Sequence, residues 1–223
     1  MQATKFQILS FLAALLPLLP AQLFSQNKAE WQLKRKSGGV EVYTREAEDS
    51  PFKELKFLAT FEASLSSIAA ILNDVEHYDE WVYKSSEAEL IKKVNDREMY
   101  YYERFDFPWP LDDRDVVAWT QVWQDPKTLA LHSKTNSAHW LRKELDDVVR
   151  IKKMEIEWIF TPIGNGKIRS EYYLKTDPGG SLPAWLVNLA ADQGPLQTMI
   201  DFKEMLKTEK FKDAKLAFVQ EKK

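Results

Sequence analysis

The side chain with the clearest potential for chemistry is Glu103, which lies in a segment, 98–107, that alternates as a β-strand does. One face of this predicted strand combines the carboxylate with four apolar residues, Met99, Tyr101, Phe105 and Phe107. An unpaired carboxylate in an apolar environment costs several kcal/mol or stays protonated. We therefore expect Glu103 to have an ion-pair partner, for which Arg114 is available, an altered pKa, or a polar ligand group to contact.

The segment that follows this strand combines a stiff loop with a cluster of charges. Pro108 and Pro110 flank Trp109 and restrict the backbone, so the indole is predicted to point outward or over an opening. The run Asp112-Asp113-Arg114-Asp115 could suggest a cation site, but Ca²⁺ needs several spaced oxygen ligands. The adjacent arginine favours a structural network of ion pairs instead.

Other kinds of site chemistry find little support. The histidines, His77, His132 and His139, show no metal-ligand spacing, and the chain has no cysteine. It also lacks a glycine-rich phosphate loop and a nucleophile elbow. The net charge is −3 and the basic run 34–36 is short, so we interpret that run as a solvated edge and expect no nucleic-acid partner. We predict no metal, no cofactor and no catalytic residue.

The N-terminal residues have the features of a secretory signal peptide, predicted over 1–25. Lys5 precedes an apolar stretch, 6–19, that is too short to span a bilayer well, and small residues follow near Ala21 and Ser25. We expect cleavage after one of these two residues and export of the mature chain to a periplasm or the extracellular space. An uncleaved membrane anchor is the alternative.

The mature chain is predicted to form one α+β domain over 28–212, followed by a polar tail over 213–223. A short helix is expected over 29–35. Beyond it, most segments alternate as strands: 40–45, 53–62, 87–94, 98–107, 114–123, 128–135, 154–161 and 168–177. Successive alternating strands indicate an antiparallel sheet with one covered face.

The helical segments are predicted to cover this sheet. Two short helices, over 65–72 and 75–81, follow the second predicted strand. A longer helical period extends over 182–210, and Pro195 either kinks this helix or restarts it. A single amphipathic helix covers a large sheet only if the sheet curves around it, which commonly leaves a cavity. A solid core of the same residues is the alternative.

The order of several motifs resembles the START (StAR-related lipid transfer) domains over nearly all of the mature chain. The motifs are Trp31, Gly39-Val40-Glu41-Val42-Tyr43, 74–81, Tyr101-Tyr102-Glu103, Pro108-Trp109-Pro110, Arg114-Asp115-Val116-Val117 and 182–188. The resemblance implies a helix-grip fold, in which a strongly bent antiparallel sheet wraps the long C-terminal helix and leaves a tunnel for one lipid. Members bind sterols, phospholipids, ceramides or related ligands, and the domain alone is not catalytic.

The resemblance also implies roles for particular residues. The loop 106–113 and the C-terminal helix would gate the tunnel, and Glu103 would match an acidic residue that lines the cavity in several members. We expect the protein to be a monomer that binds a lipid or another hydrophobic small molecule and contacts membranes transiently. The predicted ligand-binding residues are Trp81, Tyr101, Glu103, Phe105, Trp109, Arg114, Thr120, Trp158, Tyr172 and Met199.

Two departures from the family pattern leave the lipid unnamed. In sterol-binding members a basic residue on the next strand faces the acid, whereas Thr120 occupies the corresponding position here. The choline-lipid type uses an arginine where this chain has Asp79. Two other classes stay open. One is a cyclase, aromatase or hydrolase of the same superfamily with Glu103 as general acid or base, and the other is an interaction module with a filled core.

Overall fold

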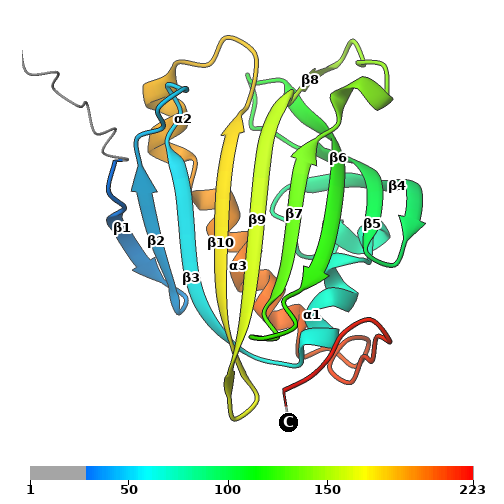
Figure 1. Ribbon diagram of the computed structural model, residues 1–223. Coiled ribbons are helices and arrows are strands. Elements are labelled where there is room, and N and C mark those ends of the chain that lie inside the picture. The colour runs from blue at the N-terminus through cyan, green and yellow to red at the C-terminus, as the bar shows by residue number, and fades with distance from the viewer. Residues whose placement is uncertain (1–28, 223) are drawn as a thin grey trace, which may run out of the picture.

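A ten-stranded sheet forms the body of the protein (Figure 1). The structure is a computed structural model that describes residues 29–222, so the predicted signal peptide lies outside the described residues. The strand order is β1-β2-β3-β10-β9-β7-β6-β5-β4, and β8 pairs with β6. The strands are β1 Gln32–Ser37, β2 Val40–Arg45, β3 Glu54–Glu62, β4 Ser85–Asn95, β5 Glu98–Phe105, β6 Asp113–Gln124, β7 Leu131–Ser137, β8 Val148–Arg150, β9 Lys153–Gly164 and β10 Lys167–Asp177.

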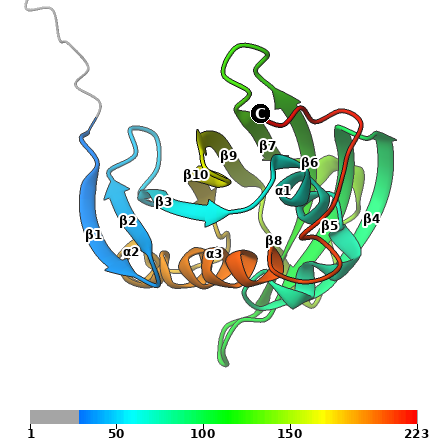
Figure 2. The same cartoon turned by 90° about the horizontal axis from the view of Figure 1, so that it is seen from below.

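The sheet curves around a C-terminal helix, as the view from below shows (Figure 2). The helices are α1 Leu65–Leu72, α2 Ala184–Ala190 and α3 Gln193–Met205, with short 3-10 turns η1 Val75–Glu80 and η2 His139–Leu141. The predicted α+β helix-grip architecture is therefore confirmed. No helix formed by residues 29–222 is long and apolar enough to cross a membrane.

Alternation along the strands sets the covered face. In β3, Leu55, Phe57, Ala59 and Phe61 are buried, as their spacing predicts. The partner strand β10 places Tyr172 opposite Phe57, so apolar rings from neighbouring strands point to the same side. All strand pairs are antiparallel except β6 with β8, a three-residue strand too short for a periodic signal.

The helix predicted over 29–35 is wrong, because these residues lead into β1, an edge strand paired with β2. The register shifts between Leu33 and Arg35, and such a bulge disturbs the alternation by which a strand is recognised. The two short helices were predicted to follow the second strand of the chain. Because β1 precedes the strands that were predicted, they follow the third.

The basic run 34–36 was predicted to be a solvated edge, but two of its side chains bind a buried carboxylate. Lys34 Nζ lies 2.6 Å from Asp192 Oδ1, and Arg35 Nε lies 2.7 Å from Asp192 Oδ2. Asp192 is buried and stands between α2 and α3. Lys34 Nζ also donates to the carbonyl oxygens of Asn188 and Leu189 at the end of α2. This cluster fixes the junction of the two helices to β1.

The predicted helix over 182–210 is two helices with a break at Ala191 and Asp192. Pro195 lies in the first turn of α3, where a missing N–H removes no intrahelical hydrogen bond, so it restarts the helix. The part of the cover that packs deeply on the sheet is α3, whose Leu196, Met199, Phe202 and Met205 are buried.

The N-terminus of α1 is completed by the last residues of the chain. Ser64 Oγ accepts a hydrogen bond from Ser67 N at 3.0 Å, as its predicted N-cap role requires. The Glu221 carboxylate accepts two more, from Leu65 N at 3.1 Å and Ser66 N at 2.8 Å. Phe218 packs against the core on the way, so the segment predicted as a polar tail is docked on the domain (Figure 2).

We expect the Glu221→Ala substitution to lower the free energy of unfolding by about 1 kcal/mol, because two helical N–H groups lose their acceptor. Urea denaturation followed by circular dichroism measures the change. Glu209→Ala is the matched control, since Glu209 is exposed and pairs only with Lys212 in the adjacent turn, a contact worth a few tenths of a kcal/mol. Equal effects of the two substitutions would contradict the capping role.

Candidate functional site

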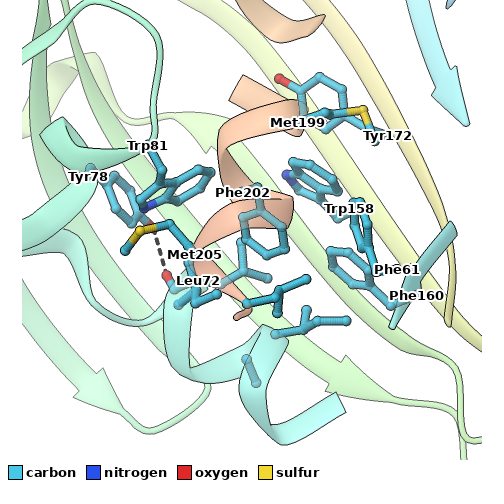
Figure 3. Close-up of a cluster of buried hydrophobic side chains, with 14 of the residues drawn as sticks. Phe61, Leu72, Tyr78, Trp81, Trp158, Phe160, Tyr172, Met199, Phe202 and Met205 are labelled. Atoms are coloured by element: carbon cyan, nitrogen blue, oxygen red, sulfur yellow. Dashed lines mark hydrogen bonds between the residues drawn. The ribbon is translucent and has the colours of Figure 1, made fainter. Parts of the chain in front are cut away.

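Aromatic side chains line the concave face of the sheet and meet those of the covering helix (Figure 3). The ring of Trp158 lies 4.3 Å from that of Tyr172 and 5.5 Å from that of Phe202, between centroids. Phe202 lies 5.0 Å from Trp81, and Tyr78 continues the series to Tyr101 at 5.4 Å. The rings thus form a continuous chain across the interior.

Five hydrophobic side chains among the predicted ligand-binding residues lie in this interior. Trp81, Tyr101, Trp158, Tyr172 and Met199 are all buried; Trp81 directly follows η1, and the others come from three strands and α3. Sequence reasoning missed Phe202, although the spacing of three residues from Leu196 through Met199 indicates that Phe202 shares their face.

Glu103 is buried among these rings, with its side chain on the inner face of β5. Its Oε1 atom has no hydrogen-bond partner among residues 29–222. Burial raises the pKa of Glu103 to about 8. The hydroxyl of Ser85 lies close enough to oppose this rise, although the two groups are not aligned for a hydrogen bond. The carboxyl group therefore holds its proton at neutral pH unless a ligand changes its surroundings.

Thr120 lies on the same face as Glu103 but not opposite it. The register pairs Glu103 with Val116, whereas Thr120 pairs with Met99. Thr120 Oγ1 lies 2.6 Å from Thr135 Oγ1 on β7, so this hydroxyl already has a neighbour in the described chain. The expectation that Thr120 faces the acid, which rested on counting along the strand, is wrong by four residues.

Arg114 lies at the end of the sheet where the loop 106–112 and the β10–α2 connection meet. Its Nε donates to the Pro178 carbonyl oxygen at 3.3 Å, and Nη1 donates to the carbonyl oxygen of Asp112. The guanidinium carbon lies 4.6 Å from the centre of the Phe107 ring. Arg114 is therefore not the ion-pair partner of Glu103.

The acidic cluster around Arg114 does form ion pairs, as predicted, but with other arginines. Arg104 Nη2 lies 2.8 Å from Asp113 Oδ2. The fully buried Arg150 binds both oxygens of Asp115, at 2.7 and 2.8 Å. Arg150 was not singled out in the sequence because nothing near it in the chain indicates burial.

Two predicted residues lie at the edge of the interior or outside it. Phe105 is half-buried, opposite Arg114 in the register. The side chain of Trp109 is 91% exposed and points away from the interior. Of the two orientations considered for Trp109, the outward one is present in the structure.

Two serines that were not among the predicted ligand-binding residues add polar atoms to the interior. Ser85 Oγ and Ser170 Oγ are buried without a hydrogen-bond partner among residues 29–222. Ser170 lies opposite Phe160 on β9 and Ala59 on β3, within the apolar wall. Buried polar groups are usually hydrogen-bonded, so these atoms, with Glu103 Oε1, mark places where a ligand could bind.

Two grooves of the protein lie away from this interior. One, of about 440 Å³, runs beneath the C-terminal segment beside Phe211 and Phe218. The other, of about 500 Å³, lies on the outer face of the sheet around Trp31 and Tyr173. Neither contains a predicted ligand-binding residue.

A curved antiparallel sheet that wraps a C-terminal helix, with an apolar interior that holds an isolated carboxyl group, defines a helix-grip fold. Comparison with known proteins agrees. The START domain family matches residues 21–210, and the chain belongs to this family.

Its relatives include proteins named for lipid transfer. Phosphatidylcholine transfer protein of Rattus norvegicus is 26% identical over 170 residues, which cover 74% of this chain and 78% of the relative. An uncharacterized protein of Pseudomonas aeruginosa, PA1579, is 30% identical over 76% of this chain and 83% of its own. Among solved structures, a STAR-related lipid transfer protein from Xanthomonas axonopodis has a TM-score of 0.74 at 25% identity, covering 80% of this chain and 99% of that one.

We expect the stability difference between Glu103→Gln and the natural protein to depend on pH. The folded protein holds the Glu103 proton up to about pH 8, whereas the unfolded chain releases it near the ordinary value of 4.5. The natural protein therefore loses stability as the pH rises between these values, and the glutamine variant lacks this loss. The variant should gain up to about 5 kcal/mol relative to the natural protein over this range.

Urea denaturation at several pH values measures this difference. Glu76→Gln, at an exposed position of η1, is the control and should show no such trend. A pH-independent difference for Glu103→Gln would exclude a protonated Glu103 in the folded protein.

Proposed function

We propose that this protein is an exported, non-catalytic carrier that holds one lipid between the curved sheet and α3. The observation that carries the proposal is the isolated carboxyl group of Glu103 within an interior lined by aromatic rings. Such a site combines a large apolar surface with a few polar atoms that orient a ligand. Membership of the START family and the lipid-transfer names of its relatives support the same conclusion.

Binding would be driven by removal of the lipid's apolar surface from water, at about 25 cal/mol per Å². Side chains of α3 now occupy the concave face, so a lipid must displace some of them. Met199 and Met205 are suited to this, because their unbranched side chains adapt to different shapes.

The gate in this proposal is made of α2 and the loop 106–112. All residues of α2 are at least partly exposed, and its Trp185 is 70% exposed, so little apolar contact holds this helix down. Its C-terminal end is fixed through Asn188, Asp192 and Lys34. The helix can therefore swing about this end while α3 stays packed.

Export is supported by the basic residue and short apolar stretch of the predicted signal peptide. We propose that the mature protein acts as a monomer in a periplasm or outside the cell. Without cysteine it needs no disulfide formation in either compartment.

The alternative function is an enzyme, and it would need more than the carboxyl group of Glu103. An enzyme that used Glu103 as a general acid or base would need a second polar group to position a reacting atom. Ser85 is the side chain that influences Glu103 in the folded protein, and the other neighbours that feel its charge are tyrosines. We therefore favour ligand orientation over catalysis as the role of this carboxyl group.

We expect the protein to take up one phospholipid from vesicles whose acyl chains carry bromine atoms. After separation from the vesicles, native mass spectrometry should show the protein plus one lipid, with reduced tryptophan fluorescence because bromine quenches indoles nearby. Trp158→Phe should lose part of this quenching, since Trp158 lies in the interior, whereas Trp123→Phe on the outer face should not. A protein that emerges without lipid would exclude the carrier function.

We also propose that the protein contacts membranes transiently, through a surface at one end of the sheet. The loop 106–112, the η2 segment and α2 all follow or precede strand ends at one end of the sheet (Figure 1). Their side chains Trp109, Trp140, Trp185 and Leu189 are 91%, 67%, 70% and 65% exposed. Tryptophan favours the interface between lipid and water, so this end is suited to touch a bilayer while the gate opens.

We expect Trp109→Ala and Trp185→Ala each to weaken binding to lipid vesicles about tenfold, the effect of losing about 1.4 kcal/mol of apolar burial. Vesicle co-sedimentation measures the binding. Trp123→Ala is the control, because Trp123 is 41% exposed but lies on the outer face of β6 near the opposite end. A loss as large in this control would mean that the effect is not specific to the gate end.

A further inference from the structure

The last part of the described chain, residues 211–222, forms a C-terminal strap that lies beyond the residues matched by the family, 21–210. The strap crosses α1 at one end of the sheet (Figure 2). The connections from β4 to β5, from β6 to β7 and from β9 to β10 lie at this end, whereas the loop 106–112 joins β5 to β6 at the other. The strap therefore lies at the end of the sheet that is opposite the proposed gate.

Side-chain hydrogen bonds attach the strap to the turns at this end. Gln220 N donates to Gln124 Oε1 at 2.9 Å, and Gln124 Nε2 donates back to the Gln220 carbonyl oxygen at 2.8 Å. Gln124 is the last residue of β6. Lys222 Nζ donates to the carbonyl oxygen of Pro162, near the end of β9, at 3.5 Å. Together with the cap that Glu221 provides for α1, these contacts connect the strap to three separate parts of the fold.

The helix α1 is covered on two opposite faces, so that seven of its eight residues are buried. On one face, Ser67 Oγ donates to the Lys212 carbonyl oxygen of the strap at 3.2 Å, and Ala70 lines the groove beneath the strap. The helical period places four apolar residues on the opposite face: Leu65, Ile68, Ala69 and Leu72. A helix of this length is not stable alone in water, so its position depends on the interior on one side and the strap on the other.

The inner face of α1 meets the aromatic rings of the interior (Figure 3). The Tyr78 hydroxyl donates to the Leu72 carbonyl oxygen at 2.6 Å, and this bond joins the end of α1 to the chain of rings. Phe61, at the end of β3 just before α1, has its ring 5.7 Å from that of Phe202 on α3. The apolar interior therefore ends at α1, and its other end lies at the loop 106–112 and α2.

We propose that α1, held in place by the strap, is the floor of the lipid site and limits the length of the acyl chain that the protein carries. This inference rests on the proposed lipid-carrier function and adds a limit on its ligand. The acyl chain of a lipid that enters at the gate extends toward α1. A chain that is too long must displace α1 and break contacts of the strap, whereas a chain that is too short leaves volume empty and forfeits dispersion contacts.

The test offers the full-length protein vesicles that contain equal amounts of phosphatidylglycerols that differ only in acyl-chain length. Native mass spectrometry of the recovered protein gives the distribution of bound chain lengths. Ile68→Ala removes most of a side chain from the inner face of α1, so the most abundant bound lipid should be longer by about three methylene groups, the volume that the substitution frees. Ile68→Val should shift it by about one and replaces the alanine variant if that variant fails to fold.

Loosening the strap should relax the same limit. Gln124→Ala removes both hydrogen bonds to Gln220 and leaves α1 and the interior unchanged. The share of bound lipids longer than the natural optimum should rise about fivefold, the effect of losing about one net hydrogen bond. A strap that only stabilised the fold would leave this distribution as it is.

Ile159→Ala and Gln121→Ala are the matched controls, since Ile159 lies on the outer face of β9 and Gln121 is exposed on β6, and both should keep the natural distribution. An unchanged distribution in Ile68→Ala with normal lipid uptake would overturn the inference and leave the carrier function standing. An unchanged distribution in Gln124→Ala alone would overturn the role of the strap. Recovery of the natural protein without lipid of any length would overturn both the inference and the carrier function.

Discussion

A single constraint governs this molecule: the concave face of a ten-stranded sheet has to be covered by two short, deeply packed helices, α1 and the 13-residue α3. Aliphatic side chains of ordinary size would leave that volume empty, and empty volume forfeits dispersion contacts. Large rings fill it from both sides, with Phe202 on the helix meeting Trp158 and Phe160 on the sheet. The short length of the helical cover thus explains why aromatic rings fill the interior of the protein.

The C-terminal part of the helical cover consists of two helices, α2 and α3, which pack on the sheet to different extents. Asp192 is held by two cationic side chains of β1, and it separates a buried helix, α3, from an exposed one, α2. The helical cover is therefore packed deeply on the sheet after Asp192 and only loosely before it. At the same end of the sheet, Arg114 joins the loop 106–112 to the β10–α2 connection through two carbonyl oxygens. Polar contacts of charged side chains thus connect the parts that would separate in the proposed gate.

Sequence periodicity could predict the sheet, α1 and the burial of Glu103, because each depends on contacts that repeat along the chain. It failed for β1, where a bulge interrupts the alternation, and for the position opposite Glu103, because register depends on where strands pair and not on counting. It also missed Arg150, whose burial is decided by distant strands. The family resemblance supplied the helix-grip topology, which local patterns leave open.

The pairing of β3 with β10 and the cap that Glu221 provides for α1 join the beginning of the domain to its end. Strands β1 to β3 emerge first during synthesis, yet their sheet partner is the last strand to be made. Closure of such distant segments is slow, since the loop entropy is lost before the contacts form. During synthesis of this protein the edge of β3 therefore stays unpaired until β10, the last strand, has been made.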